Sequence, residues 1–117
     1  YNSPLFSLLV ARYMQGLLVQ VQICLRENLN TVISPKRIHD VLAKHYEDSE
    51  FITVNPLDTT QSPVELNPEK LNHSNMLEID VFFNKEETQC LLTATLDNLG
   101  KGASRAAIQS MELMLDL

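Results

Sequence analysis

The amino-acid sequence predicts an α+β fold, in which an antiparallel-rich mixed sheet has helices packed on one face. Residues 17–25, 77–83 and 90–96 alternate between two kinds of side chain, as half-buried strands do. After Ser34, apolar residues recur three and four positions apart, which is the period of an amphipathic helix. The predicted order of elements is strand, helix, strand, strand, strand, helix, and this order favours the α+β class.

Local signals define the first half of the chain. Ser34 followed by Pro35 combines an N-cap residue with proline at the first helical position, so a helix should begin there. Residues 51–54 predict a short strand, which ends at Asn55 and Pro56. Residues 55–75 contain three of the five prolines and predict one long loop, of the kind that is often functional.

The second half predicts a β-hairpin followed by a helix. The polar segment 84–87 separates two alternating runs, so residues 77–83 and 90–96 should pair, with one face buried and the other partly wet. Phe82 falls on the wet face and could mark a second contact surface. Residues 97–102 contain two glycines and predict a turn, after which small and apolar residues predict a helix from Ala103 onward.

Composition restricts the class of protein. The chain has 117 residues, which is enough for one domain with its own core. A formal net charge of −6 argues against nucleic acid or an anionic membrane as a partner. The two cysteines are too few for a disulfide framework and lack metal-ligand spacing. We therefore predict no metal site and a reducing, cytoplasmic location.

The start of the chain suggests an excised domain. It begins at Tyr1 rather than methionine and enters apolar sequence from Leu5 onward. It lacks the features of a signal peptide and has no run of about 18 apolar residues. We expect residues 1–117 to form a single domain cut from a longer chain. Such a domain exposes the apolar surface that met its neighbour, so we also expect a homodimer or higher oligomer.

The best local candidate for a site is the segment 97–104, where a buried strand passes through a glycine-containing turn into a helix. Backbone N–H groups at a helix start, together with the Asn98 amide, suit a polar ligand such as a carboxamide or a phosphate. A simple turn with a helix cap would explain the same residues without any ligand. Both interpretations stay open on the residues alone.

The C-terminal segment contains a recognisable motif. Its positions are Asp97, Asn98, Leu99, Lys101, Gly102, Ala103, Ala107, Gln109, Met111, Leu113 and Met114. These residues match the closing segment of N-acetyl-gamma-glutamyl-phosphate reductases, which the chain therefore resembles. The Asp-Asn-Leu-x-Lys-Gly turn is also similar to that of the related aspartate-semialdehyde dehydrogenases, but the Met-x-Leu-Met ending favours the reductase. Gly16-Leu17-Leu18 and Ser74-Asn75 resemble further family segments.

The resemblance implies a fold similar to the C-terminal domain of glyceraldehyde-3-phosphate dehydrogenase. It also implies that the parent protein is an NADP-dependent oxidoreductase of arginine biosynthesis, which reduces N-acetylglutamyl phosphate to the semialdehyde. In such proteins a separate dinucleotide-binding domain holds most of the NADP and supplies the nucleophilic cysteine. This chain would then be the substrate and dimerisation domain, with that domain and a second copy as its partners, and would be inactive in isolation.

Site residues follow from the same resemblance. Cofactor contacts are implied for Asn98, Gly102 and Ala103. Substrate contacts are implied for Gln15, Arg12 and Asn75. Two departures stand out, because Leu9 occupies the family's acid/base histidine position and Gln15 its arginine position. Loss of a positioned acid or base costs about 10²–10⁴ in rate. His73 is the candidate replacement; the alternative is a catalytically inactive dimerisation or ligand-binding module of the same fold.

Overall fold

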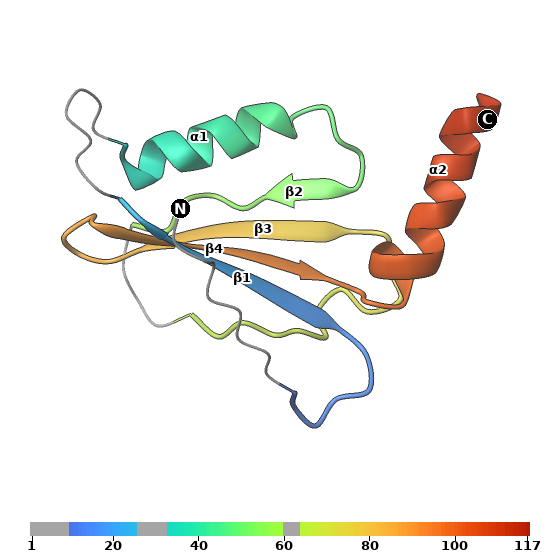
Figure 1. The fold of residues 1–117 in the computed structure, drawn as a ribbon, viewed down its shortest axis with the longest axis horizontal. Coiled ribbons are helices and arrows are strands. Elements are labelled where there is room, and N and C mark those ends of the chain that lie inside the picture. The colour runs from blue at the N-terminus through green and yellow to red at the C-terminus, as the bar shows by residue number, and fades with distance from the viewer. Residues whose placement is uncertain (1–9, 26–32, 60–63) are drawn as a thin grey trace, which may run out of the picture.

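A computed structural model describes residues 10–25, 33–59 and 64–117. Its centre is a four-stranded sheet with the order β1-β4-β3-β2 (Figure 1). The sheet consists of β1 (Leu17–Cys24), β2 (Ile52–Val54), β3 (Leu77–Phe83) and β4 (Gln89–Leu96). Strand β4 pairs antiparallel with both β1 and β3, while β2 pairs parallel with β3. The sheet is therefore mixed and antiparallel-rich, and the predicted α+β class is confirmed.

Strand register gathers the apolar side chains on one face. Val21 lies opposite Leu92, which in turn lies opposite Val81, so three strands contribute to the same row. Val81 and Cys90 are only 4% and 3% exposed. The core therefore lies over the two central strands β3 and β4, as the period-two pattern of both strands predicts.

The opposite face of the sheet is drier than predicted. Thr93 and Thr95 point to this face and are 1% and 4% exposed. The segment that connects β2 to β3 contacts it: Asn55 Nδ2 donates to Asp80 Oδ1 over 2.8 Å, and Lys70 pairs with Glu78. The prediction of a partly wet face holds at the half-buried carboxylates of β3, but it is wrong for the two threonines, since sequence alternation does not show what a distant loop covers.

Helix α1 (Pro35–His45) begins where the sequence predicts and lies over β2 and β3 (Figure 1). Ser34 Oγ accepts a hydrogen bond from the backbone N–H of Arg37 over 3.2 Å, and Pro35 occupies the first turn, where no N–H is needed. His39 Nε2 lies 3.0 Å from the carbonyl oxygen of Asn55. The helix is thus fixed to the segment that leaves β2.

The last helix begins earlier than predicted and does not lie on the sheet. A π-helical turn, η1 (Gly100–Ser104), starts inside the predicted turn and leads into α2 (Arg105–Leu115). Its wide turn is closed by a hydrogen bond from Gly102 N to Asp97 O over 2.8 Å, which spans five residues. No residue of α2 is buried, and the helix extends beyond the end of the sheet (Figure 1). Of the two helices, only α1 packs on a sheet face.

Edge strand β1 has an open apolar stripe. Leu17, Val19 and Val21 point to one face of the sheet, as the sequence predicts, but they remain 39%, 42% and 50% exposed. Helix α1 lies over the opposite edge of the sheet and leaves this stripe uncovered. An exposed apolar row on an edge strand is a surface that favours association.

Replacing Ser34 with alanine should lower the free energy of unfolding by about 1 kcal/mol, because the N–H of Arg37 loses its acceptor. Urea unfolding followed by circular dichroism measures the change. Ser34→Asn keeps an acceptor at the N-cap and should remain within about 0.5 kcal/mol of the parent. Equal losses in both variants would contradict the capping role.

Candidate functional site

Three chain segments meet at one end of the sheet, where α2 also begins (Figure 1). Because β4 runs antiparallel to β1 and β3, the residues that follow β4 lie beside those that precede the other two strands. We call this meeting point the junction and define it as residues 15–16, 72–75 and 97–104. It contains most of the residues that the sequence singled out.

The carboxylate of Asp97 lies at the centre of the junction and is 1% exposed. Its Oδ2 accepts from Gln15 Nε2 over 2.7 Å and from the backbone N–H of His73 over 2.8 Å. Its Oδ1 accepts from the backbone N–H of Leu99 over 2.9 Å. One side chain therefore joins all three segments, and each of these donors is a neutral N–H group.

Hydrogen bonds to its charged form hold the pKa of Asp97 far below the ordinary carboxyl value. The largest cause is the Gln15 amide; the backbone N–H groups of Gly100, Leu99 and His73 act in the same direction, and burial opposes them. An ordinary carboxyl has a pKa of about 4. The ionised group consequently stabilises the fold above about pH 4, and this contribution is lost as the pH falls further.

Asn98 and Asn72 make the second set of links. Asn98 Oδ1 accepts from the backbone N–H of Gly16 over 2.8 Å, and Asn72 Nδ2 donates to the carbonyl oxygen of Gln15 over 3.2 Å. Residues 15–16 are thus held from two directions before β1 begins. With its carbonyl oxygen engaged, Asn98 keeps an amide nitrogen that can donate to a ligand.

Two glycines make the close approaches possible. Gly16 has a φ of 113°, and a Cβ at this position would lie 2.4 Å from the carbonyl oxygen of Pro68. A Cβ on Gly100 would lie 2.8 Å from Asp97 Oδ2. Larger residues at either position would push the three segments apart.

The predicted cofactor contacts occupy an accessible part of the junction. Gly102 and Ala103 are exposed on η1, and Asn98 is half-buried beside them. Lys101 points elsewhere, since its Nζ lies 2.8 Å from Gln109 Oε1 and 5.3 Å from the centre of the Phe51 ring. It fixes η1 to α2 and to the segment before β2.

The predicted substrate contacts are not all placed alike. Gln15 is half-buried and uses its amide nitrogen on Asp97, whereas Arg12 is exposed. Asn75 is half-buried, and its Oδ1 is buried without a hydrogen-bond partner in the described residues. Leu9, at the predicted histidine position, lies outside the described residues.

His73 belongs to the junction mainly through its backbone. Its φ is 64°, its N–H binds Asp97, and its carbonyl oxygen accepts from Arg105 over 3.0 Å. The side chain is exposed. Its suggested role as an acid or base stays a prediction.

Three residues of the junction were missed by reasoning from the sequence: Asp97 as its centre, Gly16 and Asn72. The pair Asp97-Asn98 directly after a buried strand was an available signal, because a carboxylate at a strand end needs donors. Gly16 before a strand was another. Nothing local indicates Asn72, whose partner Gln15 lies 57 residues away in the sequence.

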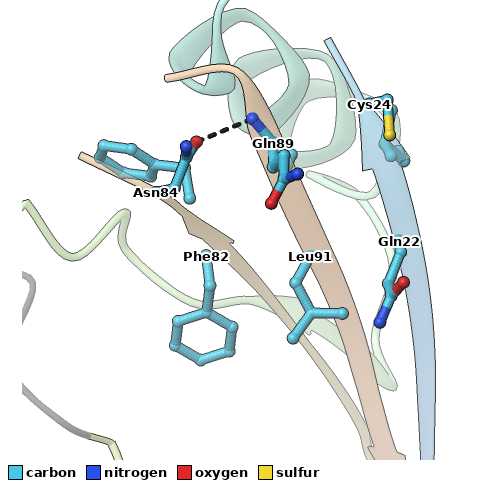
Figure 2. Close-up of a pocket in the computed structure, with 9 residues that line it drawn as sticks. Gln22, Cys24, Phe82, Asn84, Gln89 and Leu91 are labelled. Carbon is cyan, nitrogen blue, oxygen red and sulfur yellow. Dashed lines mark hydrogen bonds between the residues drawn. The ribbon is translucent and has the colours of Figure 1, made fainter. Parts of the chain in front are cut away.

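A shallow depression of about 290 Å³ lies at the opposite end of the sheet, around the hairpin between β3 and β4 (Figure 2). Phe82 and Leu91 form its apolar part, and Gln22 lies beside them on β1. The backbone N–H of Gln89 donates to Asn84 Oδ1 over 2.7 Å at its rim (Figure 2). The depression shares no residue with the junction.

Within the described ranges, no group of three or more histidine, cysteine, aspartate or glutamate side chains could hold a metal ion. No helix in that part of the chain is long and apolar enough to cross a membrane. Cys24 is exposed and Cys90 buried, and burial raises the pKa of the Cys90 thiol. Cys90 is therefore poorly suited to be a nucleophile.

The fold and the junction together define a class of protein domain. It is a small α+β domain whose polar groups gather at one end of a mixed sheet. Residues 2–98 match the family model described as semialdehyde dehydrogenase, dimerisation domain, and the chain belongs to this family. Helix α2 and all of η1 follow the matched residues.

Among curated proteins, the chain is similar to N-acetyl-gamma-glutamyl-phosphate reductases. It is 43% identical to that of Burkholderia lata and 44% identical to that of Burkholderia ambifaria, in each case over 114 residues. It is 39% identical over 112 residues to N-acetyl-gamma-glutamyl-phosphate reductase 2 of Pseudomonas putida. These alignments cover 96–97% of the chain but only 36% of each relative, so the chain spans about a third of their length.

Alanine at position 16 should lower the free energy of unfolding by about 1–3 kcal/mol, because it combines a positive φ with a backbone clash. Gly102→Ala is the matched control, since a Cβ there meets nothing closer than 3.3 Å. Chemical unfolding of both variants compares the two positions. Similar losses at Gly16 and Gly102 would contradict the tight approach to Pro68.

Proposed function

We propose that this chain is the substrate and dimerisation domain of an NADP-dependent N-acetyl-gamma-glutamyl-phosphate reductase of arginine biosynthesis. The observation that carries the proposal is an identity of about 40% along nearly the whole chain to proteins of that name. The same alignments cover about a third of each relative, which supports a longer parent protein. A separate dinucleotide-binding domain in that parent is part of the proposal. We further propose a cytoplasmic location, in keeping with unpaired Cys24 and Cys90.

The junction fits a role beside the nicotinamide ring. Asn98 is held by Gly16 and can still donate its amide N–H to a carboxamide. Exposed Gly102 and Ala103 let a ligand approach the backbone of η1 closely. NADP would accept or supply the hydride, and it would be bound mainly by the other domain. The residues of this chain would orient its reactive end.

The substrate side would be formed by Gln15, Arg12 and Asn75. Asn75 is half-buried in the junction, and its contact with substrate is part of this proposal. Neither cysteine of the chain lies in the junction, so the acyl group would be carried by a cysteine of the other domain. His73 remains the candidate acid or base of this domain.

Helix α2 supports the presence of that second domain. Its side chains Leu113 and Met114 are 77% and 85% exposed, and Ile108 and Met111 are about half exposed. A helix with so much apolar surface gains stability from a covering partner. We propose that α2 packs against the dinucleotide-binding domain of its own chain.

We propose that self-association uses the open apolar stripe of β1. Leu17, Val19 and Val21 form a continuous row on β1, which is an edge strand of the sheet that the described residues form. Pairing of two copies would cover both the row and the edge. The description of the family as a dimerisation domain supports self-association.

An inactive relative that keeps only dimerisation or ligand binding is the second candidate. Leu9 and Gln15 favour it, because they replace the histidine and arginine of the family pattern. Leucine cannot transfer a proton, and the Gln15 amide is bound to Asp97. The complete Asp97–Ala103 turn favours the active enzyme instead.

The full-length protein should reduce NADP in the presence of phosphate and N-acetylglutamate semialdehyde, which is the reverse of the biosynthetic reaction. Asn98→Ala should raise the KM for NADP by about tenfold, because a hydrogen bond to the carboxamide is lost. Asn84→Ala removes a hydrogen-bonded asparagine at the far end of the sheet and should leave the KM for NADP unchanged. Absent turnover from a folded protein that binds NADP would favour the inactive module.

Val21→Glu should weaken dimerisation of the full-length protein by at least about tenfold in Kd, since it places a charge in the apolar stripe. Gln22→Glu introduces the same charge one residue later, on the opposite face, and should leave the dimer intact. Sedimentation velocity over a range of concentrations compares the two variants. Dissociation by Gln22→Glu alone would place the interface at the Phe82 and Leu91 depression.

A further inference from the structure

We propose that Asp97 is a positioning residue, which fixes the substrate-side segment 15–16 and the backbone of His73 relative to the cofactor-side turn that begins at Asn98. This inference rests on the proposed function. Asp97 would touch neither substrate nor cofactor, because it is 1% exposed and its oxygens are occupied by groups of the chain itself.

The geometry connects the two sides of the junction through one rigid unit. Asp97 Oδ2 receives Gln15 Nε2 at 2.7 Å, while Asn98 Oδ1 receives the next backbone N–H, that of Gly16, at 2.8 Å. Consecutive residues of one turn therefore hold consecutive residues of the other segment. A shift of the turn would move Gln15 and Gly16 with it.

The carboxylate also decides how the Gln15 amide is oriented. An ionised carboxylate only accepts hydrogen bonds, so the amide must present its nitrogen to Asp97 and direct its oxygen away. The second donor to Oδ2, the N–H of His73, belongs to a residue with a φ of 64°. Fixing this uncommon backbone conformation sets the direction of the His73 side chain.

The position of the Asp97 carboxylate also explains why residue 100 is a glycine. A Cβ at position 100 would lie 2.8 Å from Asp97 Oδ2 and 3.1 Å from the carbonyl oxygen of Ser74. Turn, carboxylate and the 72–75 segment are therefore packed without spare room. Such packing suits a group that transmits position, since a displacement of about 1 Å near reacting groups can cost 10²-fold in rate.

An exchange of polarity between positions 15 and 97 tests the proposal in the full-length protein. Asp97→Asn replaces one accepting oxygen by an NH2 group, which must face either the Leu99 N–H or the Gln15 and His73 N–H groups, and Gln15→Glu sets a second carboxylate against Asp97. Each single change therefore removes hydrogen bonds of the junction. The double variant lets the new Asn donate to the new Glu and restores the link between positions 97 and 15 with reversed direction, while the His73 N–H, which shares Asp97 Oδ2 with Gln15, stays without its acceptor. Steady-state kinetics and backbone amide hydrogen exchange are measured on all four proteins.

Each single variant should raise the KM for the semialdehyde by about tenfold or more, and the double variant should recover much of that loss. Faster amide exchange at residues 15–16 and 72–74 should accompany the loss in Asp97→Asn, and the double variant should reverse it at residues 15–16. A merely structural role would reduce the amount of folded enzyme, and thus the apparent kcat, without changing KM. Unchanged KM in both single variants, or no recovery in the double variant, would overturn the proposal.

Failure of the proposed function gives a different pattern. If the unchanged protein does not act on the semialdehyde, the reductase assignment fails, and amide exchange alone then decides the role of Asp97. Faster exchange in Asp97→Asn that reverses at residues 15–16 in the double variant supports the positioning role. Unaltered exchange at residues 15–16 and 72–74 overturns it.

Discussion

The arrangement of the junction depends on one buried carboxylate, that of Asp97. Asp97 is accessible to almost no water, and its charge is balanced by oriented N–H groups rather than by a cation. Burying an ion is costly unless such donors surround it. The donors come from segments that are close only in the folded chain. The hydrogen bonds to Asp97 therefore connect the residues before β1, the residues before β3 and the residues after β4.

Much of the architecture could be predicted because its causes are local. The alternation in residues 17–25, 77–83 and 90–96 corresponds to β1, β3 and β4, and Ser34 with Pro35 marks the start of α1 correctly. The π-helical turn η1 could not be predicted, because its hydrogen bonds depend on the position of Asp97 and not on helix propensity. Burial of Thr93 could not be predicted either, since a loop distant in the sequence lies against that face.

The sequence predicted several residues that belong to the site, but not the contacts between them. Asn98, Gly102 and Ala103 were singled out by the family pattern, and the structure places Gly102 and Ala103 on η1 and Asn98 two residues before it. Gln15 was singled out too, but its hydrogen bond to Asp97 connects residues 82 positions apart, and no spacing rule in the sequence indicates such a contact. The sequence therefore predicts the turn at residues 97–102, but it does not predict the long-range hydrogen bonds that the turn makes.

The π-helical turn has a consequence for how α2 is aimed. A π-type turn accommodates one residue more than an α-helical turn, and each residue of an α-helix rotates the direction of a side chain by about 100°. Relative to a plain α-helix starting at Gly100, η1 therefore rotates the whole apolar surface of α2 about its axis. The extra residue of η1 thus sets the rotation of α2 about its own axis. Deleting that residue would turn Met111 and Met114 to a new direction without altering any residue of α2 itself.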